Sequence, residues 1–379
     1  MASSVARTTN VATDRDRAHM GAALGLARRG LGRTWPNPSV GCVIVGPDGR
    51  VVGRGHTQPG GRPHAEVEAL AASGKAARGA TAYVSLEPCA HHGKTPPCAE
   101  ALVAAGIGRC VIATGDPDPR VAGSGIAILK AAGVEILEGV LEEEARELNA
   151  GFFARIALGR PLITLKLATS LDGKIATLSG ESKWITGPSA RAIGHQLRAT
   201  HDAILVGSGT ALADDPELTC RLPGLAAHSP VRIVLDSRLR LPLSASLVAN
   251  QTRYPTWLVT GADHPPEKLA PYREAGVTLI QLPTGRSGRV DLAAVLKALG
   301  ERGLTRLLVE GGANLATSLL VADVVDRLAW FQAPLVIGDD GMAGIGELGR
   351  AQLDRAQRFA LLSDRRIGPD GVAFYRRDT

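Results

Sequence analysis

The stretch His64-Ala65-Glu66, followed by Pro88-Cys89 and later by Cys98, is the most informative feature of the sequence. It combines one imidazole, two thiols and a carboxylate that stands two residues from the imidazole. Zinc accepts His nitrogen and Cys sulfur, and a catalytic zinc keeps three protein ligands and leaves its fourth position to water. We therefore expect one zinc ion per chain, held by His64, Cys89 and Cys98.

Glu66 indicates which chemistry this zinc performs. Zinc deaminases use a His/Cys/Cys site with a Glu that moves protons without binding the metal. Zinc lowers the pKa of bound water towards ~7, and Glu66 would take the water proton and return one to a leaving amine. A structural zinc is the alternative, with His91 or His92 as fourth ligand, but a structural site has no need of a carboxylate beside His64.

The composition favours a soluble globular protein of two domains. The chain has 379 residues, which exceeds one ordinary core. Apolar residues make up 45% and charged residues 21%, as in globular proteins. Aromatic residues are only 3%, which argues against a surface of stacked aromatic platforms for single-stranded nucleic acid. The formal charge of +6 is modest and suits a phosphorylated small molecule about as well as no anionic ligand. Lys and Arg are scattered, so we expect no nucleic-acid partner.

Cysteine usage and the N-terminal segment predict a cytoplasmic location. Three of the five cysteines, Cys42, Cys110 and Cys220, stand outside the zinc pattern, and we expect no disulfide framework. Residues 1–13 are polar and lack the apolar core of a signal peptide, so we interpret them as a disordered leader. No apolar stretch is long enough to cross a membrane.

Residues 14–158 form the first predicted domain, an α/β sheet between helices, because strand and helix patterns alternate along it. Gly46-Pro47-Asp48-Gly49 is a hairpin turn between the first two strands. Glu142-Glu143-Glu144 is interpreted as a solvated helical face, and Gly159-Arg160-Pro161 marks the domain boundary. We expect helices at 14–29, 64–73, 98–105, 125–132 and 141–158, and strands at 40–45, 51–56, 81–86, 109–114 and 134–137.

Residues 159–379 restart the alternation as a second domain without sharing a motif with the first. Polar loops follow its strands, and ligands in open α/β sheets bind at the carboxyl ends of strands. Expected strands are 162–167, 203–206, 231–235, 256–259, 277–281, 306–309 and 327–331, and expected helices are 188–199, 266–275, 292–302 and 314–321.

Three motifs of the second domain fall at such strand ends. They are Lys166–Lys174, Gly207-Ser208-Gly209-Thr210 and Glu310-Gly311-Gly312, the last of which opens a helix. A glycine pair there lets backbone amides approach a phosphate. Each motif alone is as readily a turn, and Gly311-Gly312 is not the dinucleotide fingerprint. Their shared position at strand ends favours a binding site.

Four segments resemble the bifunctional deaminase/reductase family of riboflavin biosynthesis: Thr34–Val45, His64–Glu66, Glu87–Cys98 and Asp116–Val121. Deaminases generally have Cys-x-x-Cys, whereas eight residues separate the two thiols here. The long spacing is a mark of this family. The resemblance implies a cytidine-deaminase-like three-layer α/β/α domain, followed by a dihydrofolate-reductase-like α/β domain that uses NADPH.

The same resemblance implies roles for individual residues. In the deaminase half, His64, Cys89 and Cys98 bind zinc, Glu66 transfers protons and Asn37 contacts substrate, although Asn37 between two prolines also suits a turn. Trp184 also suits a core, and Arg198 and Arg221 could be surface charge. The implied NADPH contacts are Ala168, Trp184, Thr210, Asp214, Ser237, Gly312, Ala313, Asn314, Leu315, Ala316, Thr317 and Ser318; the implied substrate contacts are Ser182, Arg198, Leu218, Arg221 and Glu310; Lys166 and Glu310 are candidates for proton transfer.

The implied reaction has two steps. The first domain would hydrolyse the 2-amino group of 2,5-diamino-6-ribosylamino-4(3H)-pyrimidinone 5′-phosphate to give 5-amino-6-(5-phosphoribosylamino)uracil. The second domain would reduce the ribosyl group to ribityl with NADPH. Fused enzymes of this kind often form homo-oligomers. Two alternatives are a deaminase of nucleic-acid bases with a C-terminal binding domain, and a zinc-stabilised ligand- or RNA-binding module without activity.

Overall fold

The computed structural model describes residues 11–92 and 96–378. The chain divides into two compact units, Met1–Ala157 and Leu158–Thr379. The predicted leader, residues 1–13, lies outside the described residues except for its last three. No helix in the described part of the chain is both long enough and apolar enough to cross a membrane.

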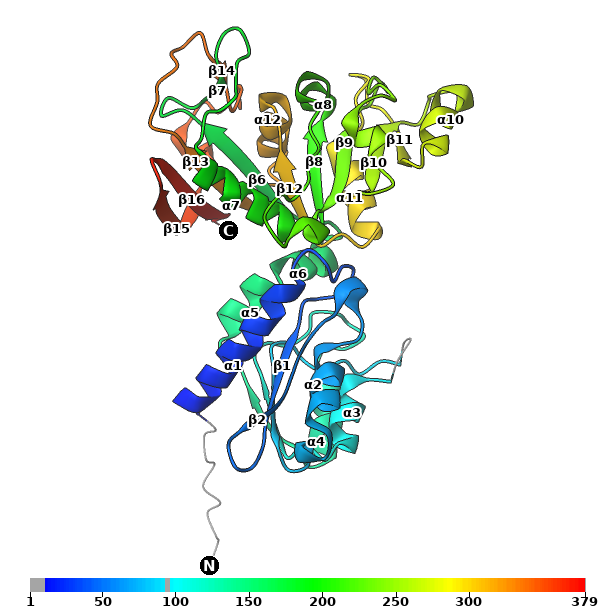
Figure 1. Cartoon of the computed structure of the whole chain (residues 1–379), viewed down its shortest axis with the longest axis vertical. Helices are drawn as coiled ribbons and strands as arrows, with labels where there is room; N and C mark the ends of the chain where they lie inside the picture. Colours follow the sequence, from blue (N-terminus) through cyan, green and yellow to red (C-terminus); the bar gives the residue numbers. More distant parts are fainter. Residues whose placement is uncertain (1–10, 93–95, 379) are drawn as a thin grey trace, which may run out of the picture. The chain divides into compact units, whose positions relative to one another are not determined.

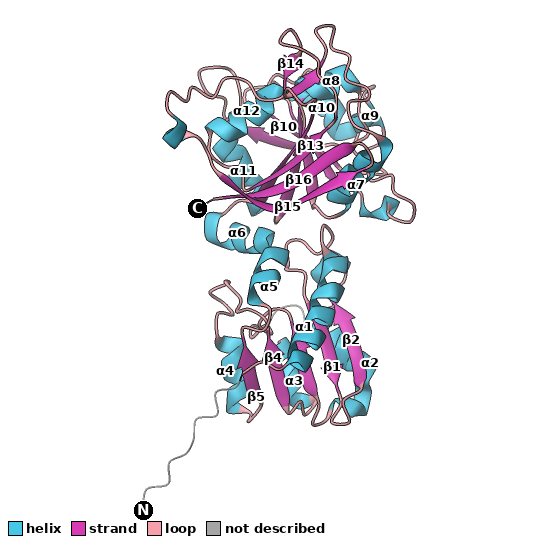
Figure 2. Cartoon of the chain, turned by 90° about the vertical axis from the view of Figure 1, so that its left-hand side faces the viewer, coloured by secondary structure: helices cyan, strands magenta, loops and turns pink. Residues whose placement is uncertain are grey.

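The first unit contains a five-stranded mixed sheet in the order β2-β1-β3-β4-β5. Figure 1 labels β1 and β2, and Figure 2 also labels β4 and β5. The predicted hairpin is confirmed, since β1 and β2 pair antiparallel. Strands β3, β4 and β5 are parallel, so their carboxyl ends meet at one edge. The strands are β1 (Gly41–Val45), β2 (Val51–His56), β3 (Thr81–Val84), β4 (Arg109–Ile112) and β5 (Glu135–Glu138).

Alternating side chains of these strands enter two separate cores, which makes three layers. Cys42 and Ile44 face a core shared with the helices of one side, and Val43 and Val45 face the core on the other side. Figure 2 shows the sheet between its helices. The three-layer α/β/α prediction is confirmed. The first layer contains α2 (Ala65–Ser73), α3 (Cys98–Ala104) and α4 (Ser124–Ala131); the other contains α1 (Asp14–Ala27) and α5 (Glu142–Leu148).

The single helix predicted over 141–158 is wrong, because the segment forms α5 and then α6 (Ala150–Leu158). Asn149 stands at the break with its side chain buried. Its Oδ1 accepts from the backbone N–H of Ser39 and its Nδ2 donates to the carbonyl of Ser39. These two bonds tie the break to the loop before β1. The Glu142-Glu143-Glu144 run is exposed, as expected.

The second unit contains a nine-stranded sheet in the order β11-β10-β9-β8-β12-β6-β13-β16-β15. The first seven strands in this order are parallel to one another. Strand β16 pairs antiparallel with β13 on one side and with β15 on the other. Consecutive residues Leu307, Leu308 and Val309 are all buried, so both faces of β12 are covered. The strands are β6 (Leu162–Thr169), β8 (Ala203–Gly207), β9 (Val231–Leu235), β10 (Thr256–Gly261), β11 (Thr278–Leu282), β12 (Arg306–Glu310), β13 (Arg327–Gln332), β15 (Phe359–Ile367) and β16 (Asp370–Arg377).

The sequence patterns missed several elements of this unit. The β15–β16 hairpin went unpredicted; no residue of its outer strand is buried, and the strand becomes polar at Ser363–Arg366. The loop expected around Gly207–Thr210 continues as helix α8 (Ser208–Asp214). A small separate sheet pairs β7 (Lys174–Ala176) with β14 (Met342–Ala343). The other helices are α7 (Pro188–Ala199), α9 (Ser246–Ala249), α10 (Pro266–Glu274), α11 (Leu292–Glu301) and α12 (Ala313–Val321), with 3-10 turns at Arg28–Gly30, Pro59–Gly61, Gly74–Ala77, Ala226–His228 and Leu353–Arg355.

Helix α7 matters for the second site because it is amphipathic. Ala190 and Ile193 pack with Phe331 of β13 and Val372 of β16 in one apolar cluster. This packing fixes the helix on the sheet beside the carboxyl end of β6.

Candidate functional sites

The predicted zinc ligands converge. His64 is the N-cap of α2, Cys98 is the first residue of α3, and Cys89 lies in the segment after β3. His64 Nδ1 is 3.2 Å from Cys98 Sγ and 3.6 Å from Cys89 Sγ. A tetrahedral zinc with Zn–N of about 2.0 Å and Zn–S of about 2.3 Å requires N···S distances of about 3.5 Å. The cluster therefore has both the donor atoms and the spacing that zinc needs.

His91 and His92, the candidates for a fourth zinc ligand, do not belong to this cluster. Among the described residues, the group of potential ligands consists of His64, Cys89 and Cys98. His92 Nε2 lies 3.2 Å from Glu100 Oε1. His91 lines the adjoining cavity, and its buried Nδ1 has no hydrogen-bond partner among the described residues. The described residues thus supply three ligands, as a catalytic site does.

The ionisable groups of this cluster have shifted pKa values. The hydrogen bond with Cys98 lowers the pKa of Cys89 to about 4, and the same contact raises the pKa of Cys98. Burial raises the pKa of Glu66 to about 7. A carboxyl group with such a pKa can both accept and donate a proton near neutral pH.

A cavity of about 320 Å³ adjoins the zinc ligands and is lined by Glu66 and Asn37, among others. Asn37 Nδ2 donates to the carbonyl of Gly61 at 3.0 Å. Several other polar residues line the cavity. Asp116, Asp118 and Arg120 belong to a segment that carries the family resemblance, but no role was predicted for them, although they follow β4 at its carboxyl end. Arg62 and Arg155 were not singled out, and His91 was considered only as a zinc ligand.

Glu87 fixes the loop that carries Asp116. Its buried carboxylate accepts the backbone N–H groups of Asp116 at 3.3 Å, Gly123 at 3.0 Å and Gly125 at 3.0 Å. Glu87 directly precedes Pro88-Cys89, so one side chain ties the metal corner to the cavity wall. Burial raises the pKa of Asp116 to about 6.

A second cavity, of about 290 Å³, lies in the other unit. Seven residues singled out from the sequence line it, although they come from distant parts of that sequence. Trp184 is 66% exposed, so the core interpretation of this side chain is wrong. These residues are Lys166, Ala168, Ser182, Trp184, Arg198, Arg221 and Glu310.

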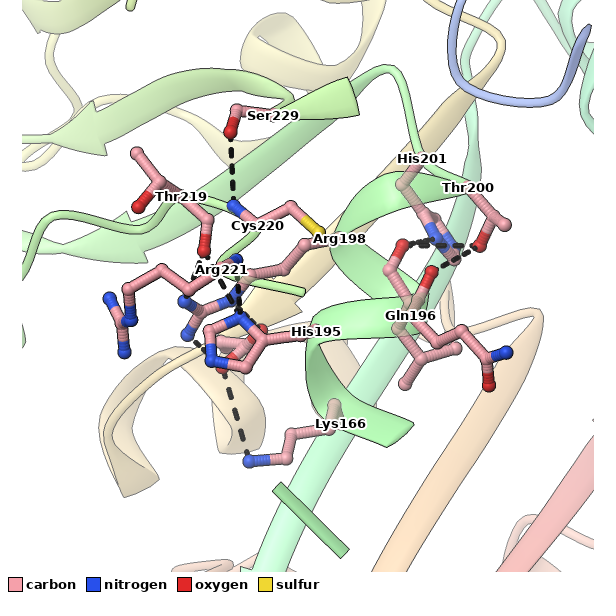
Figure 3. A network of polar contacts seen from close by, with 12 residues as sticks. Lys166, His195, Gln196, Arg198, Thr200, His201, Thr219, Cys220, Arg221 and Ser229 are labelled. Atoms are coloured by element: carbon pink, nitrogen blue, oxygen red, sulfur yellow. Dashed lines mark hydrogen bonds and ion pairs between the residues drawn. The ribbon is translucent and has the colours of Figure 1, made fainter. Parts of the chain in front are cut away.

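Glu310 is the electrostatic centre of this cavity. Its carboxylate accepts from Arg198 Nε at 2.8 Å and Nη2 at 2.9 Å, and Lys166 Nζ lies 3.9 Å away. Burial acts to raise the pKa of Glu310, but Arg198 and Lys166 outweigh it and lower that pKa to about 2. Burial lowers the pKa of Lys166. Figure 3 shows Lys166 and Arg198 among these contacts.

The remaining residues implied for the cofactor do not line this cavity; they lie in α8, at the start of α12 and in the segment after β9. Thr210 Oγ1 accepts the N–H of Gly312 at 3.0 Å, which joins α8 to the start of α12. Ser237, after β9, accepts the N–H of Val290 at 3.0 Å through its hydroxyl. Leu218, which was implied as a substrate contact, is buried and does not line the cavity either. Asp214 ends α8, and the segment Ala313–Ser318 belongs to α12.

Arg191 and His195 also line the second cavity, although they were not predicted from the sequence. Together with Arg198 they stand at i, i+4 and i+7 of α7, positions that share one helical face. This spacing in the sequence could have indicated that the three side chains lie together.

Family models match both halves. The cytidine and deoxycytidylate deaminase zinc-binding region matches residues 13–114, and the RibD C-terminal domain matches residues 161–372.

Relatives match nearly the whole length. The riboflavin biosynthesis protein RibD of Aquifex aeolicus is 44% identical over 96% of this chain and 98% of its own. RibD of Escherichia coli is 43% identical, over 94% and 97%. The Acinetobacter baumannii RibD structure superposes with a TM-score of 0.86 at 38% identity, covering 96% of this chain and 99% of that one. A Thermotoga maritima diaminohydroxyphosphoribosylaminopyrimidine deaminase/5-amino-6-(5-phosphoribosylamino)uracil reductase gives 0.83 at 34%, covering 96% and 99%.

Proposed function

This chain belongs to the RibD family of bifunctional riboflavin-biosynthesis deaminases and reductases, and from this premise we propose the reaction of each site. The first unit hydrolyses the 2-amino group of 2,5-diamino-6-ribosylamino-4(3H)-pyrimidinone 5′-phosphate. The second reduces the ribosyl group of the deaminated product with NADPH. The observation that carries the proposal is the three-ligand His/Cys/Cys cluster beside the buried Glu66.

In the first unit, His64, Cys89 and Cys98 would hold zinc, which when bound supplies hydroxide at neutral pH. Glu66 takes a proton from the attacking water and returns one to the leaving amine, so ammonia departs and a ring carbonyl remains. Asn37 binds the substrate in the cavity. Glu87 holds the Asp116 loop, which keeps the cavity wall in place around the ring.

In the second unit, NADPH when bound supplies a hydride for the sugar C1. Ala168, Trp184, Thr210, Asp214, Ser237 and Gly312–Ser318 would bind it. Ser182, Arg198, Leu218 and Arg221 would hold the sugar phosphate. Lys166 and Glu310 lie within ion-pair distance of each other. They can donate and accept the protons that ring opening of the ribosylamine requires.

One incubation tests both activities and their order. The protein receives the diaminopyrimidinone phosphate with and without NADPH. We expect ammonia without NADPH, and then NADPH oxidation equimolar with the deaminated product. Reduction that proceeds equally well on the undeaminated compound would contradict the proposed order.

The cofactor is tested separately by thermal unfolding of the full chain with added NADPH. At 100 times its Kd, a ligand adds about 2.7 kcal/mol to the stability of the unit that binds it. We expect the transition of the second unit alone to rise. An unchanged transition would refute NADPH binding.

A further inference from the structure

Helix α2, which begins at the zinc motif, packs on β2, the edge strand of the first sheet (Figure 2). The strand contributes no side chain to this contact, because its two buried positions are Gly53 and Gly55. The helix meets these glycines at Ala65, Ala69 and Ser73, small residues spaced four apart on one face. The helix therefore lies closer to the strand than a layer of side chains would allow.

Gly55 meets the helix in its first turn. A Cβ at this position would lie 2.2 Å from the carbonyl oxygen of Ala65 and 2.7 Å from the backbone nitrogen of Ala69. These two atoms stand in the relation of acceptor and donor of an α-helical hydrogen bond. Gly55 does not have a left-handed φ, so glycine is needed here for space and not for backbone conformation.

The residue that Gly55 contacts stands between two members of the zinc site. Ala65 separates His64, a predicted zinc ligand, from Glu66, the predicted proton carrier. With alanine at position 55, the contact with Ala65 would have to open by about 0.8 Å to reach even 3.0 Å. Catalytic groups must be held within about 0.5 Å of their working positions. The required shift is therefore large enough to disturb both neighbours of Ala65.

Gly125 makes the corresponding contact at the corner that carries Cys89. It is the second residue of α4, and a Cβ there would lie 1.9 Å from the carbonyl oxygen of Pro88. Pro88 directly precedes Cys89. Gly125 likewise does not have a left-handed φ, and its N–H donates to the Glu87 carboxylate at 3.0 Å. The Cys89 corner thus rests on the backbone of α4, as the start of α2 rests on the backbone of β2.

We propose that Gly55 and Gly125 are positioning residues of the deaminase site. Gly55 sets the place of the segment that carries His64 and Glu66, and Gly125 sets the place of the corner that carries Cys89. Both act through the backbone that they allow to approach, since neither has a side chain that could reach the metal. The proposal rests on the proposed function of the first unit.

G53A is the matched control for G55A. Both glycines belong to β2 and face the same helix, and a Cβ at Gly53 would lie equally close, at 2.2 Å, to the carbonyl oxygen of Ala69. Overpacking should therefore destabilise both variants to a similar extent in urea unfolding followed by circular dichroism. The G55A contact is at the turn that carries the zinc motif, and the G53A contact is one turn later. A difference between the two variants at the metal hence reports positioning and not general damage.

Zinc binding is measured on the full chain by competition with a chromophoric chelator, and ligand geometry by the absorption spectrum of bound cobalt(II). We expect the Kd for zinc to rise about 10- to 100-fold in G55A, the usual cost of losing a residue that orients metal ligands. The cobalt spectrum of G55A should also change. In G53A the Kd for zinc and the cobalt spectrum should stay as in wild type.

Ammonia release from the diaminopyrimidinone phosphate at saturating zinc gives a second readout. We expect kcat to fall about 10- to 100-fold in G55A, because a displacement near 1 Å costs a catalytic group about that much. KM should not change, since Glu66 moves while the contacts that bind the substrate remain. G53A should keep the wild-type kcat.

G125A tests the proposal without altering the contact between α2 and β2, so it also serves if G55A does not fold. Alanine stabilises a helix by up to about 1 kcal/mol relative to glycine, which offsets part of the strain at Pro88. The control is G25A in α1, where an added Cβ meets no atom within 4 Å. We expect a raised Kd for zinc in G125A and an unchanged one in G25A.

Equal zinc affinities and kcat values in G53A and G55A, or a wild-type Kd for zinc in G125A, would overturn the positioning role. A wild-type chain that binds zinc but releases no ammonia would instead refute the proposed function, and the zinc affinities of the variants would still decide the positioning role.

Discussion

The two cavities are built from opposite kinds of sequence information. The zinc ligands and Glu66 lie between residues 64 and 98, on two helix starts and one corner. The residues of the second cavity extend from Lys166 to Phe331 and come from separate strands, helices and loops. A metal requires particular donor atoms at short range, so its site leaves a compact motif. Binding of a nucleotide and a sugar phosphate requires only positions and charges, which packing can bring from anywhere in the unit.

The largest expected effect separates the two cavities chemically. E66Q removes the proton carrier but none of the three zinc ligands, so ammonia release should fall about 10²- to 10⁴-fold. Zinc content and NADPH oxidation with the deaminated substrate should stay at wild-type levels. The matched control is E68Q, two residues along the same helix. Ammonia release at the wild-type rate in E66Q would break the assignment.

The next effect concerns the centre of the second cavity. E310Q leaves the cations of Arg198 and Lys166 without their carboxylate, and breaking a buried pair costs about 3–5 kcal/mol. We expect the unfolding midpoint in urea to fall and NADPH oxidation to drop about 100-fold or more. Three of the four tryptophans, Trp184, Trp257 and Trp330, lie in this unit, so intrinsic fluorescence reports mainly its unfolding. Ammonia release should not change. A parallel loss of ammonia release in E310Q would contradict the independence of the two sites.

Acid sharpens the same contrast. The pKa of Glu310 is about 2 in the folded chain against an ordinary 4.5. Because the folded value is the lower one, this stabilisation is fully present above pH 4.5 and disappears as the pH falls towards 2. It amounts to about 3 kcal/mol. The stability difference between wild type and E310Q should therefore shrink over that interval in urea titrations at several pH values. A constant difference would show that Glu310 is not the titrating group.

The smallest effect concerns Gly194 of α7, which lines the second cavity. G194A adds a methyl group that meets no atom within 4 Å, in the interior of a helix. It should stabilise the second unit by up to about 1 kcal/mol through helix propensity. G300A is the contrasting variant, since its Cβ would lie 2.3 Å from the carbonyl oxygen of Gly159 and should destabilise. Destabilisation by G194A would mean that the cavity has no room for a methyl group at this position.

The sequence predicted the first unit well because its signals are local. Its strands and helices could be recognised from local patterns, and His64, Cys89 and Cys98 followed from ligand chemistry. The break at Asn149 was not predictable, since it depends on hydrogen bonds to Ser39, which is 110 residues away.

The second unit was predicted less completely because its signals are distributed. Its parallel strands were recognisable from apolar runs, but in β15 the apolar run covers only Phe359–Leu362 and polar residues follow it. Arg198 and Glu310 were singled out as substrate contacts, whereas their pairing across 112 residues appears only in the fold. Arg191 and His195 looked like ordinary polar residues of a helix until the cavity placed them together.

The central claim is that two separate sites act in sequence, and one measurement tests it most directly. The E66Q protein is supplied with NADPH and either the diaminopyrimidinone phosphate or its deaminated product, and NADPH oxidation is followed. We predict oxidation at the wild-type rate with the deaminated product and almost none with the diamino compound. Oxidation at the wild-type rate with the diamino compound would contradict the account.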